Sequence, residues 1–179
     1  MVTRRFLRMA EWILALAVTG IAQNPSEQPL PPEVKKTIEA VSGQWVGEMS
    51  ASFPGLKAEK FPWEMTCAPV ALGSGASCAI KGQPPFGPIE ESCLLAFDPE
   101  GMKVHFMCVT SMREVHDHRG DWTSEREIRF EAYPTTWDRQ PATEDVMFEF
   151  RGSDHIRTRS IITARTGARL AFEFNGVRK

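Results

Sequence analysis

The feature that most constrains the fold is an alternation of apolar and polar residues that starts at Trp45. In the first run, apolar or small residues stand at Trp45, Gly47, Met49, Ala51 and Phe53. A period of two is typical of a strand with one buried face. The same pattern recurs almost to the C-terminus, so strands dominate the prediction.

Further alternating runs share this period and are separated by short segments rich in Gly, Pro and Asp: 61–67, 76–80, 89–97, 102–110, 122–131, 146–151, 155–163 and 168–174. Residues 133–141 interrupt the series as an irregular stretch. About nine strands with no helix between them predict an antiparallel all-β fold. Since closure removes exposed sheet edges, we expect one barrel of about 8–10 strands.

One short helix is expected ahead of the strands, over residues 33–42. Val34, Ile38 and Val41 follow one another at i, i+4 and i+7, which places them on one apolar stripe. Gly43 comes directly after this stripe and suits the end of a helix. We expect the helix to pack over an end of the barrel.

The N-terminal residues have the composition of a targeting segment. Residues 1–22 combine three Arg, a short apolar run and small residues at Gly20 and Ala22, as in a secretory signal cleaved after Ala22. An uncleaved anchor is the alternative. A Pro-rich linker over 23–32 and one domain over 33–179 would follow. This organisation predicts a periplasmic or extracellular protein.

The charge balance excludes several classes of partner. Cleavage would remove three Arg and one Glu, which moves the formal charge from −2 to −4. The remaining chain has no basic block, so we expect neither nucleic acid nor membrane as a partner.

Four cysteines, an even number, fall in the part expected to reach an oxidising compartment, where disulfides are the usual state. Cys67, Cys78, Cys93 and Cys108 each share a strand face with apolar neighbours, so all four should point inward. Their spacing leaves all three pairings open, and four buried thiols are the alternative. No Cys-x-x-Cys spacing supports a zinc site.

Short motifs in this order resemble a known family of secreted bacterial domains. The matching elements are Gly43, Trp45 and Gly47; Thr66-Cys67; Gly73 and Cys78; Phe97-Asp98; and Gly120-Asp121-Trp122. The Gly-x-Trp start resembles that of lipocalins, and the whole series resembles the lipocalin-like domain family of unknown function numbered fifteen seventy-nine. This resemblance implies a lipocalin-like barrel and a Cys67–Cys78 disulfide, and it implies no reaction.

The barrel interior is the first candidate site. Its lining would hold a small apolar ligand, and the residues expected to contact it are Trp45, Met49, Trp63, Met65, Phe106, Phe130, Phe148 and Phe172. Aromatic and Met side chains suit an adaptable apolar pocket. Apolar alternation is equally demanded by folding, so a filled barrel that serves as a structural or protein-interaction module is an alternative.

The second candidate is a metal site at His116 and His118, which gives a metal-dependent activity as an alternative function. Two imidazoles two residues apart share one face of a strand and can chelate a metal when a third ligand joins them. His105 or Glu114 could supply that ligand. The alternative interpretation treats this charged segment as a solvated connection between strands.

Haem and other cofactors are not expected. The nitrobindin-type barrels share a Gly-x-Trp-x-Gly start and bind haem through an axial His, for which His155 is the candidate here. Alternation places His155 on the face opposite to Ile156, outside the barrel.

Nothing in the sequence indicates catalysis, so the chain is expected not to be an enzyme. No Gly-x-Ser-x-Gly motif is present. Glu90-Glu91 and Glu144-Asp145 are adjacent pairs, and neighbours on a strand face opposite sides, so neither pair can share a substrate.

Overall fold

The structure, a computed structural model, describes residues 29–137 and 139–179. Its elements, in chain order, are α1 (Pro32–Val41), β1 (Gly43–Ser52), β2 (Glu59–Val70), a 3₁₀ turn (Ala71–Gly73), β3 (Gly75–Gly82), β4 (Ile89–Asp98), β5 (Lys103–Thr110), β6 (Val115–Ser124), β7 (Glu127–Phe130), β8 (Tyr133–Trp137), β9 (Gln140–Phe150), β10 (His155–Ala164) and β11 (Arg169–Arg178).

The predicted signal segment 1–22 and residues 23–28 of the predicted linker lie outside the described residues. Within the described part, no helix has the length and apolar character that a membrane span requires.

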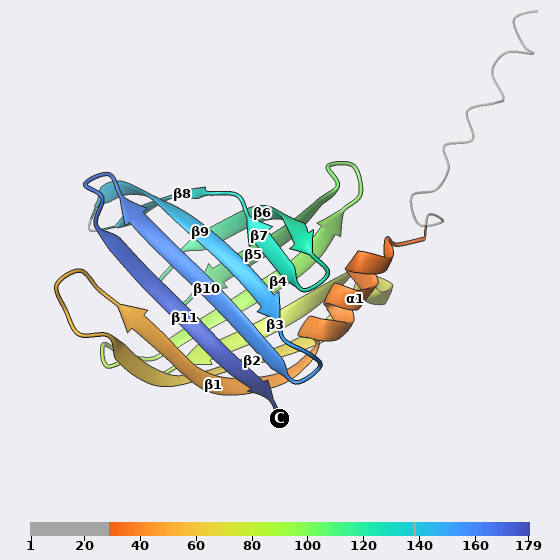
Figure 1. Cartoon of the computed structure of the whole chain (residues 1–179), viewed down its shortest axis with the longest axis horizontal. Helices are drawn as coiled ribbons and strands as arrows, with labels where there is room; N and C mark the ends of the chain where they lie inside the picture. The colour runs from red at the N-terminus through yellow and green to blue at the C-terminus, as the bar shows by residue number, and fades with distance from the viewer. Residues whose placement is uncertain (1–28, 138) are drawn as a thin grey trace, which may run out of the picture. The chain divides into compact units, whose positions relative to one another are not determined.

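The strands form a closed antiparallel barrel, as predicted (Figure 1). Ten strands follow one another in the order β10, β11, β1 to β7 and β9, and pairing of β9 with β10 closes the ring. The remaining strand, β8, pairs with the same edge of β9 as β7 does. β7 pairs with residues 147–149 of β9, and β8 pairs with residues 140–144.

This division of the β9 edge leaves the barrel wall incomplete beside β6. Residues 120–124 of β6 pair with β7, and among the described residues 115–118 of β6 have no backbone ladder with β8. The Tyr133 hydroxyl donates a long hydrogen bond of 3.4 Å to the Val115 carbonyl. β6 and β8 are therefore neighbours without being hydrogen-bonded as strands.

Two predictions for this region are wrong. The expected strand 122–131 is divided between β6 and β7 by a turn, and the expected irregular stretch 133–141 contains β8. The segment around His116 is strand β6 and not a solvated connection. This strand lacks the usual alternation of apolar and polar residues. Its outward residues are exposed to solvent, and its inward residues His116 and His118 are polar as well because they line the cavity.

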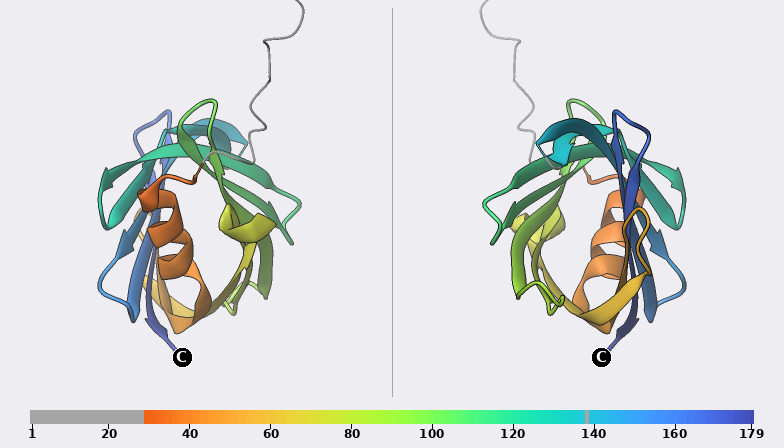
Figure 2. Two further views of the ribbon diagram at one scale, coloured as in Figure 1. Left: turned by 90° about the vertical axis from the view of Figure 1, so that its right-hand side faces the viewer. Right: turned by 90° about the vertical axis from the view of Figure 1, so that its left-hand side faces the viewer.

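The helix α1 lies across one end of the barrel, as expected (Figure 2). Its buried residues Val34, Thr37, Ile38 and Val41 face the barrel, and Leu95, Val104 and Trp122 lie beneath them. Burial of this apolar stripe is the main source of stability for so short a helix.

Hydrogen bonds tie the helix to the strands. The Trp45 indole N–H donates to the Val41 carbonyl at 2.8 Å, and the Trp122 indole N–H donates to the Thr37 hydroxyl at 2.7 Å. Arg178, near the C-terminus, donates to the carbonyls of Ser42 and Ala40. Its guanidinium lies 4.4 Å from the centre of the Trp45 ring. These bonds satisfy carbonyls that the end of a helix leaves unpaired.

All four cysteines point inward and form two disulfides, Cys67–Cys78 and Cys93–Cys108. The four stand in one row across β2 to β5, so Cys78 is also directly opposite Cys93. Both disulfides join residues whose Cα atoms are 4.1 Å apart, the close type of antiparallel pair. In an antiparallel sheet, a residue that forms a close, non-hydrogen-bonded pair with one neighbouring strand forms a wider, hydrogen-bonded pair with the other. Cys78 forms its close pair with Cys67, so its pair with Cys93 is the wider one. This difference explains why Cys78 is joined to Cys67. Two disulfides fit an extracellular or periplasmic protein.

Candidate functional site: a barrel cavity with an ionisable end

The barrel is not completely filled. It encloses a cavity of about 290 Å³, near the lower limit of typical ligand pockets. Most of the wall is apolar, and six residues expected from the sequence contribute to it: Met49, Trp63, Met65, Phe106, Phe148 and Phe172. Gly82 makes room for one of these, because a Cβ at this position would lie 2.0 Å from the Trp63 ring.

Two residues expected to contact a ligand, Trp45 and Phe130, are buried in the core as predicted but do not line the cavity. Trp45 lies at the end that α1 covers, where its indole is engaged with the helix terminus. Phe130 lies behind the cavity wall, with its ring centre 6.0 Å from that of Phe106 and 5.4 Å from that of Phe148. Alternation predicts which face a side chain occupies, but it does not say how far along the barrel the empty space extends.

Six ionisable side chains line the cavity, among them Glu114 and Arg159. We call the other four the polar cluster: Glu91, His116, His118 and Glu144. They come from β4, β6 and β9. His116 and His118 are two residues apart on β6, so both point inward. The Glu144 Oε2 atom lies 3.1 Å from His116 Nδ1 and 3.6 Å from His118 Nε2.

Glu144 is the centre of this network. It is 7% exposed, and the Ser160 hydroxyl on β10 donates to its Oε1 at 2.5 Å. Burial alone would raise the pKa of Glu144, but hydrogen bonds from His116 and Ser160 hold that pKa below its usual value. Glu144 is therefore an ionised carboxylate inside the barrel.

The two histidines differ in protonation. The hydrogen bond to Glu144 raises the pKa of His116 against the opposing effect of burial. Burial lowers the pKa of His118, which Glu144 only partly offsets. His118 is 3% exposed, and its Nδ1 has no hydrogen-bond partner among the described residues. The cluster thus holds one readily protonated imidazole beside one neutral imidazole.

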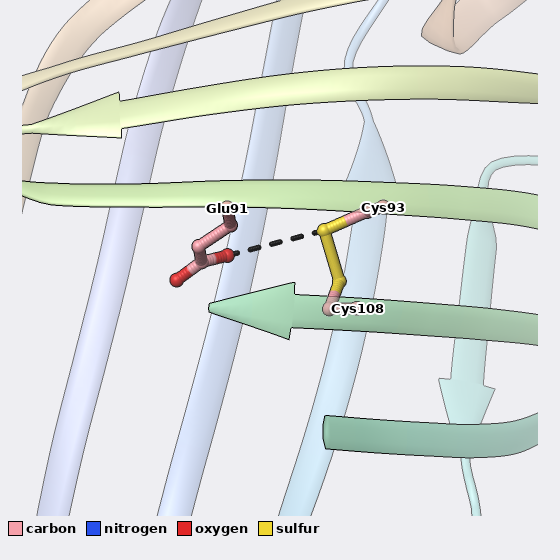
Figure 3. Close-up of side chains that lie close together, drawn as sticks. All are labelled: Glu91, Cys93 and Cys108. Carbon is pink, nitrogen blue, oxygen red and sulfur yellow. Dashed lines mark hydrogen bonds between the residues drawn. A yellow bond between two sulfur atoms is a disulfide. The ribbon is translucent and has the colours of Figure 1, made fainter. Parts of the chain in front are cut away.

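Glu91 faces the same space from β4, next to the Cys93–Cys108 disulfide (Figure 3). Burial raises the pKa of Glu91 to about 7, although His116 acts in the opposite direction. The Cys93 sulfur lies 4.0 Å from Glu91 Oε2. A disulfide sulfur has no proton to donate, so this contact is a hydrogen bond only when Glu91 is protonated and donates.

The sequence interpretation missed Glu91 and Glu144 as site residues. Each was set aside because its sequence neighbour faces the other way, but the two come together from different strands. The signal was available in the alternation itself. Glu91 stands at an inward position between Ile89 and Cys93, and Glu144 precedes the inward residue Val146 by two.

The other histidines and acids named as candidates have different surroundings. His105 is outside this cluster and contacts Asp117, with Nδ1 to Oδ1 at 3.0 Å. Glu114 lines the same cavity and lies 3.5 Å from His116 Nε2, the nitrogen that does not contact Glu144. His155 is exposed, on the outer face that alternation predicts. Among the described residues, Glu144 is the group that stands near both His116 and His118.

The cluster lies beside the incomplete part of the wall. Thr136 and Trp137 of β8 and Met112 of the turn after β5 also line the cavity, so it reaches the end of the barrel opposite α1. The arrangement combines an apolar chamber, a set of proton donors and acceptors, and an approach between β6, β8 and the neighbouring turn.

No protein-family model matches the chain, and neither does any curated protein sequence. Among solved structures, the S-type phycobiliprotein lyase CPES from Guillardia theta is 16% identical, with a TM-score of 0.59 over 82% of this chain and 92% of that one. Rv2717c from M. tuberculosis is 12% identical, with a TM-score of 0.55 over 84% of this chain and 99% of that one.

These likenesses support the lipocalin-like barrel fold and leave the family number fifteen seventy-nine without support. They contradict the expectation that the chain is not an enzyme, because a lyase is among the proteins that share this fold.

Proposed function

We propose that the barrel binds one small, mostly apolar molecule whose polar end meets the polar cluster. The observation that carries this proposal is a cavity of about 290 Å³ with two kinds of wall. Most of the wall is apolar, and one side carries the ionisable side chains of the polar cluster. A cavity with a few convergent polar groups and perturbed pKa values is the usual form of a binding or active site.

The apolar wall would supply most of the binding free energy. Burial of about 200 Å² of ligand apolar surface contributes about 5 kcal/mol, from which the cost of association is subtracted. The polar cluster would fix the orientation, with protonated Glu91 as a donor and Glu144 as an acceptor. The phycobiliprotein lyase that shares this barrel supports a site that acts on a bound molecule as well as holding it.

Binding can be tested with the uncharged fluorescent probe N-phenyl-1-naphthylamine. Phe172→Ser removes apolar wall, and we expect it to weaken probe binding at least about 10-fold. Val177→Ser is the matched control, because Val177 is on the same strand with its side chain 45% exposed on the outer face. Equal affinities of both variants and the wild type would show that the probe does not enter the barrel. Native mass spectrometry of the purified protein would identify a co-purified ligand.

We also propose that the chain is secreted, with cleavage after Ala22, and that it is a divergent member of the domain family numbered fifteen seventy-nine. The two disulfides support the oxidising compartment. N-terminal sequencing of the protein recovered from a secreting host should begin at Gln23. An intact N-terminus on exported protein would indicate the uncleaved anchor instead.

A further inference from the structure

We propose that His116, His118 and Glu144 bind one divalent first-row transition metal ion, with the remaining coordination positions open to the barrel cavity. This site goes beyond the proposed binding of an apolar molecule and does not depend on it. Two imidazoles and one carboxylate are ligands of zinc and of ferrous iron in catalytic sites that leave positions free for another molecule.

The spacing of the donor atoms fits this assignment. Metal–nitrogen and metal–oxygen bonds of about 2.1 Å at the tetrahedral angle place ligand atoms about 3.4 Å apart. Glu144 Oε2 lies 3.1 Å from His116 Nδ1 and 3.6 Å from His118 Nε2. One ligand atom from each of the three residues lies within 4.8 Å of the others. A metal ion would require only small side-chain movements.

His118 supplies an independent observation. It is 3% exposed, its Nδ1 has no partner within the described part of the chain, and its Nε2 is 3.6 Å from the nearest carboxylate oxygen. A separation of 3.6 Å is too long for a good hydrogen bond. A buried imidazole without a good hydrogen bond carries an unfavourable desolvation cost. Coordination of a metal by Nε2 would give this buried imidazole one strong partner, on the nitrogen that faces Glu144.

The groups around the three ligands match those that support metal ligands elsewhere. The Ser160 hydroxyl holds Glu144 Oε1, which leaves Oε2 directed at the two imidazoles. Glu114 lies 3.5 Å from His116 Nε2, where it can accept the proton of that nitrogen and leave Nδ1 free to coordinate. A carboxylate behind a coordinating histidine fixes its tautomer and increases its basicity.

A second group of potential ligands does not qualify. Glu91, Cys93 and Cys108 lie close together, but the two sulfurs are joined in a disulfide (Figure 3). Metal coordination by cysteine requires a thiolate. The disulfide therefore removes this group, and Glu91 remains as an acid beside the proposed metal.

The test is a Co²⁺ titration of the full chain after treatment with a chelator, followed by visible absorption. We expect one Co²⁺ per chain, and at least about 100-fold weaker binding in His118→Gln and Glu144→Gln. His105→Gln is the matched control, because His105 also contacts carboxylates but lies outside the cluster. Ser160→Ala should weaken binding about 10-fold through the position of Glu144. Absence of 1:1 binding, or equal losses in His105→Gln and His118→Gln, would overturn the proposal.

A second measurement needs no variant and so does not depend on how the variants fold. Pulsed electron paramagnetic resonance of the Cu²⁺ complex counts coordinated imidazoles, and we expect two. A count of none or one would overturn the assignment. Binding of N-phenyl-1-naphthylamine is measured in the metal-free protein, so failure of the metal site and failure of the apolar site are distinguishable.

Discussion

At the scale of single residues, the barrel interior is unusual because polar side chains occupy inward positions of strands, where apolar side chains are expected. Glu91 and Glu144 stand on the inward faces of β4 and β9, and His116 and His118 stand on the inward face of β6. A buried ionisable group is costly unless it is paired. Glu144 is paired with His116 and Ser160, whereas burial raises the pKa of Glu91 to about 7, so that Glu91 keeps its proton at a higher pH than an exposed carboxyl group.

Glu91 should make stability depend on pH. Its pKa is about 7 in the folded protein against an ordinary value of 4.5, so the folded state holds the proton more tightly. Stability from this group is complete below about pH 4.5 and is lost as the pH rises through 7, a change of about 3 kcal/mol. Urea unfolding of the wild type and Glu91→Gln at pH 4.5 and pH 8 measures it, since the variant should lack this loss.

Glu90→Gln is the control for removal of one negative charge from the same strand. Glu90 is exposed and forms a surface ion pair with Lys81. Surface pairs of this kind contribute little to stability. If Glu91→Gln and Glu90→Gln changed the pH dependence equally, the effect would not come from burial of Glu91.

At the scale of elements, α1 is held by its apolar stripe and by specific bonds from distant strands. The bond from the Trp122 indole to Thr37 joins β6 to the middle of the helix. The bonds from Arg178 join the last strand to its C-terminal end. The helix is therefore hydrogen-bonded to a strand in the middle of the chain, β6, and to the last strand, β11.

Trp122→Phe should lower the free energy of unfolding by about 1–2 kcal/mol, because the buried Thr37 hydroxyl loses its partner. Chemical denaturation of Trp122→Phe, Thr37→Val and the double variant completes a double-mutant cycle. The double variant should cost less than the two single changes added together. Simple additivity would mean that the hydrogen bond contributes nothing.

The disulfides act on adjacent strand pairs, β2 with β3 and β4 with β5. Replacing Cys67 and Cys78 together by Ser should lower the free energy of unfolding by about 3 kcal/mol, since the closed loop has a sequence separation of 11. The matched variant replaces Cys93 and Cys108, with a separation of 15, and a similar loss is expected. Thermal unfolding under non-reducing conditions measures both, and a loss under about 0.5 kcal/mol would contradict a stabilising role.

At the scale of the whole molecule, the barrel is covered by α1 at one end, and its cavity extends toward the other. The polar cluster is near that second end, beside the part of β6 that lacks a ladder with β8. A bound group at the cluster would join β6 to β9 on this side of the cavity. Ligand binding and global stability should therefore be linked.

Zn²⁺ should stabilise the folded protein if the proposed metal site exists. At a free concentration of about 100 times Kd, the expected gain in the free energy of unfolding is about 2.7 kcal/mol. Thermal unfolding with and without Zn²⁺ measures this gain, which Glu144→Gln should abolish. The same increase in the Glu144→Gln variant would place the bound zinc elsewhere on the molecule.

The sequence by itself determined the strand alternation from Trp45 onward, the inward direction of the four cysteines, the helix ahead of the strands and the shared face of His116 and His118. These properties follow from local periodicity, which a single chain segment already contains. The tertiary structure decided which cysteines join, because Cys78 stands opposite both Cys67 and Cys93 and only backbone register separates the close pair from the wide one. It also decided that Glu91 and Glu144 meet the histidines, because the pairing order from β4 to β9 brings the inward faces of three strands to one side of the cavity, and no single segment contains that information.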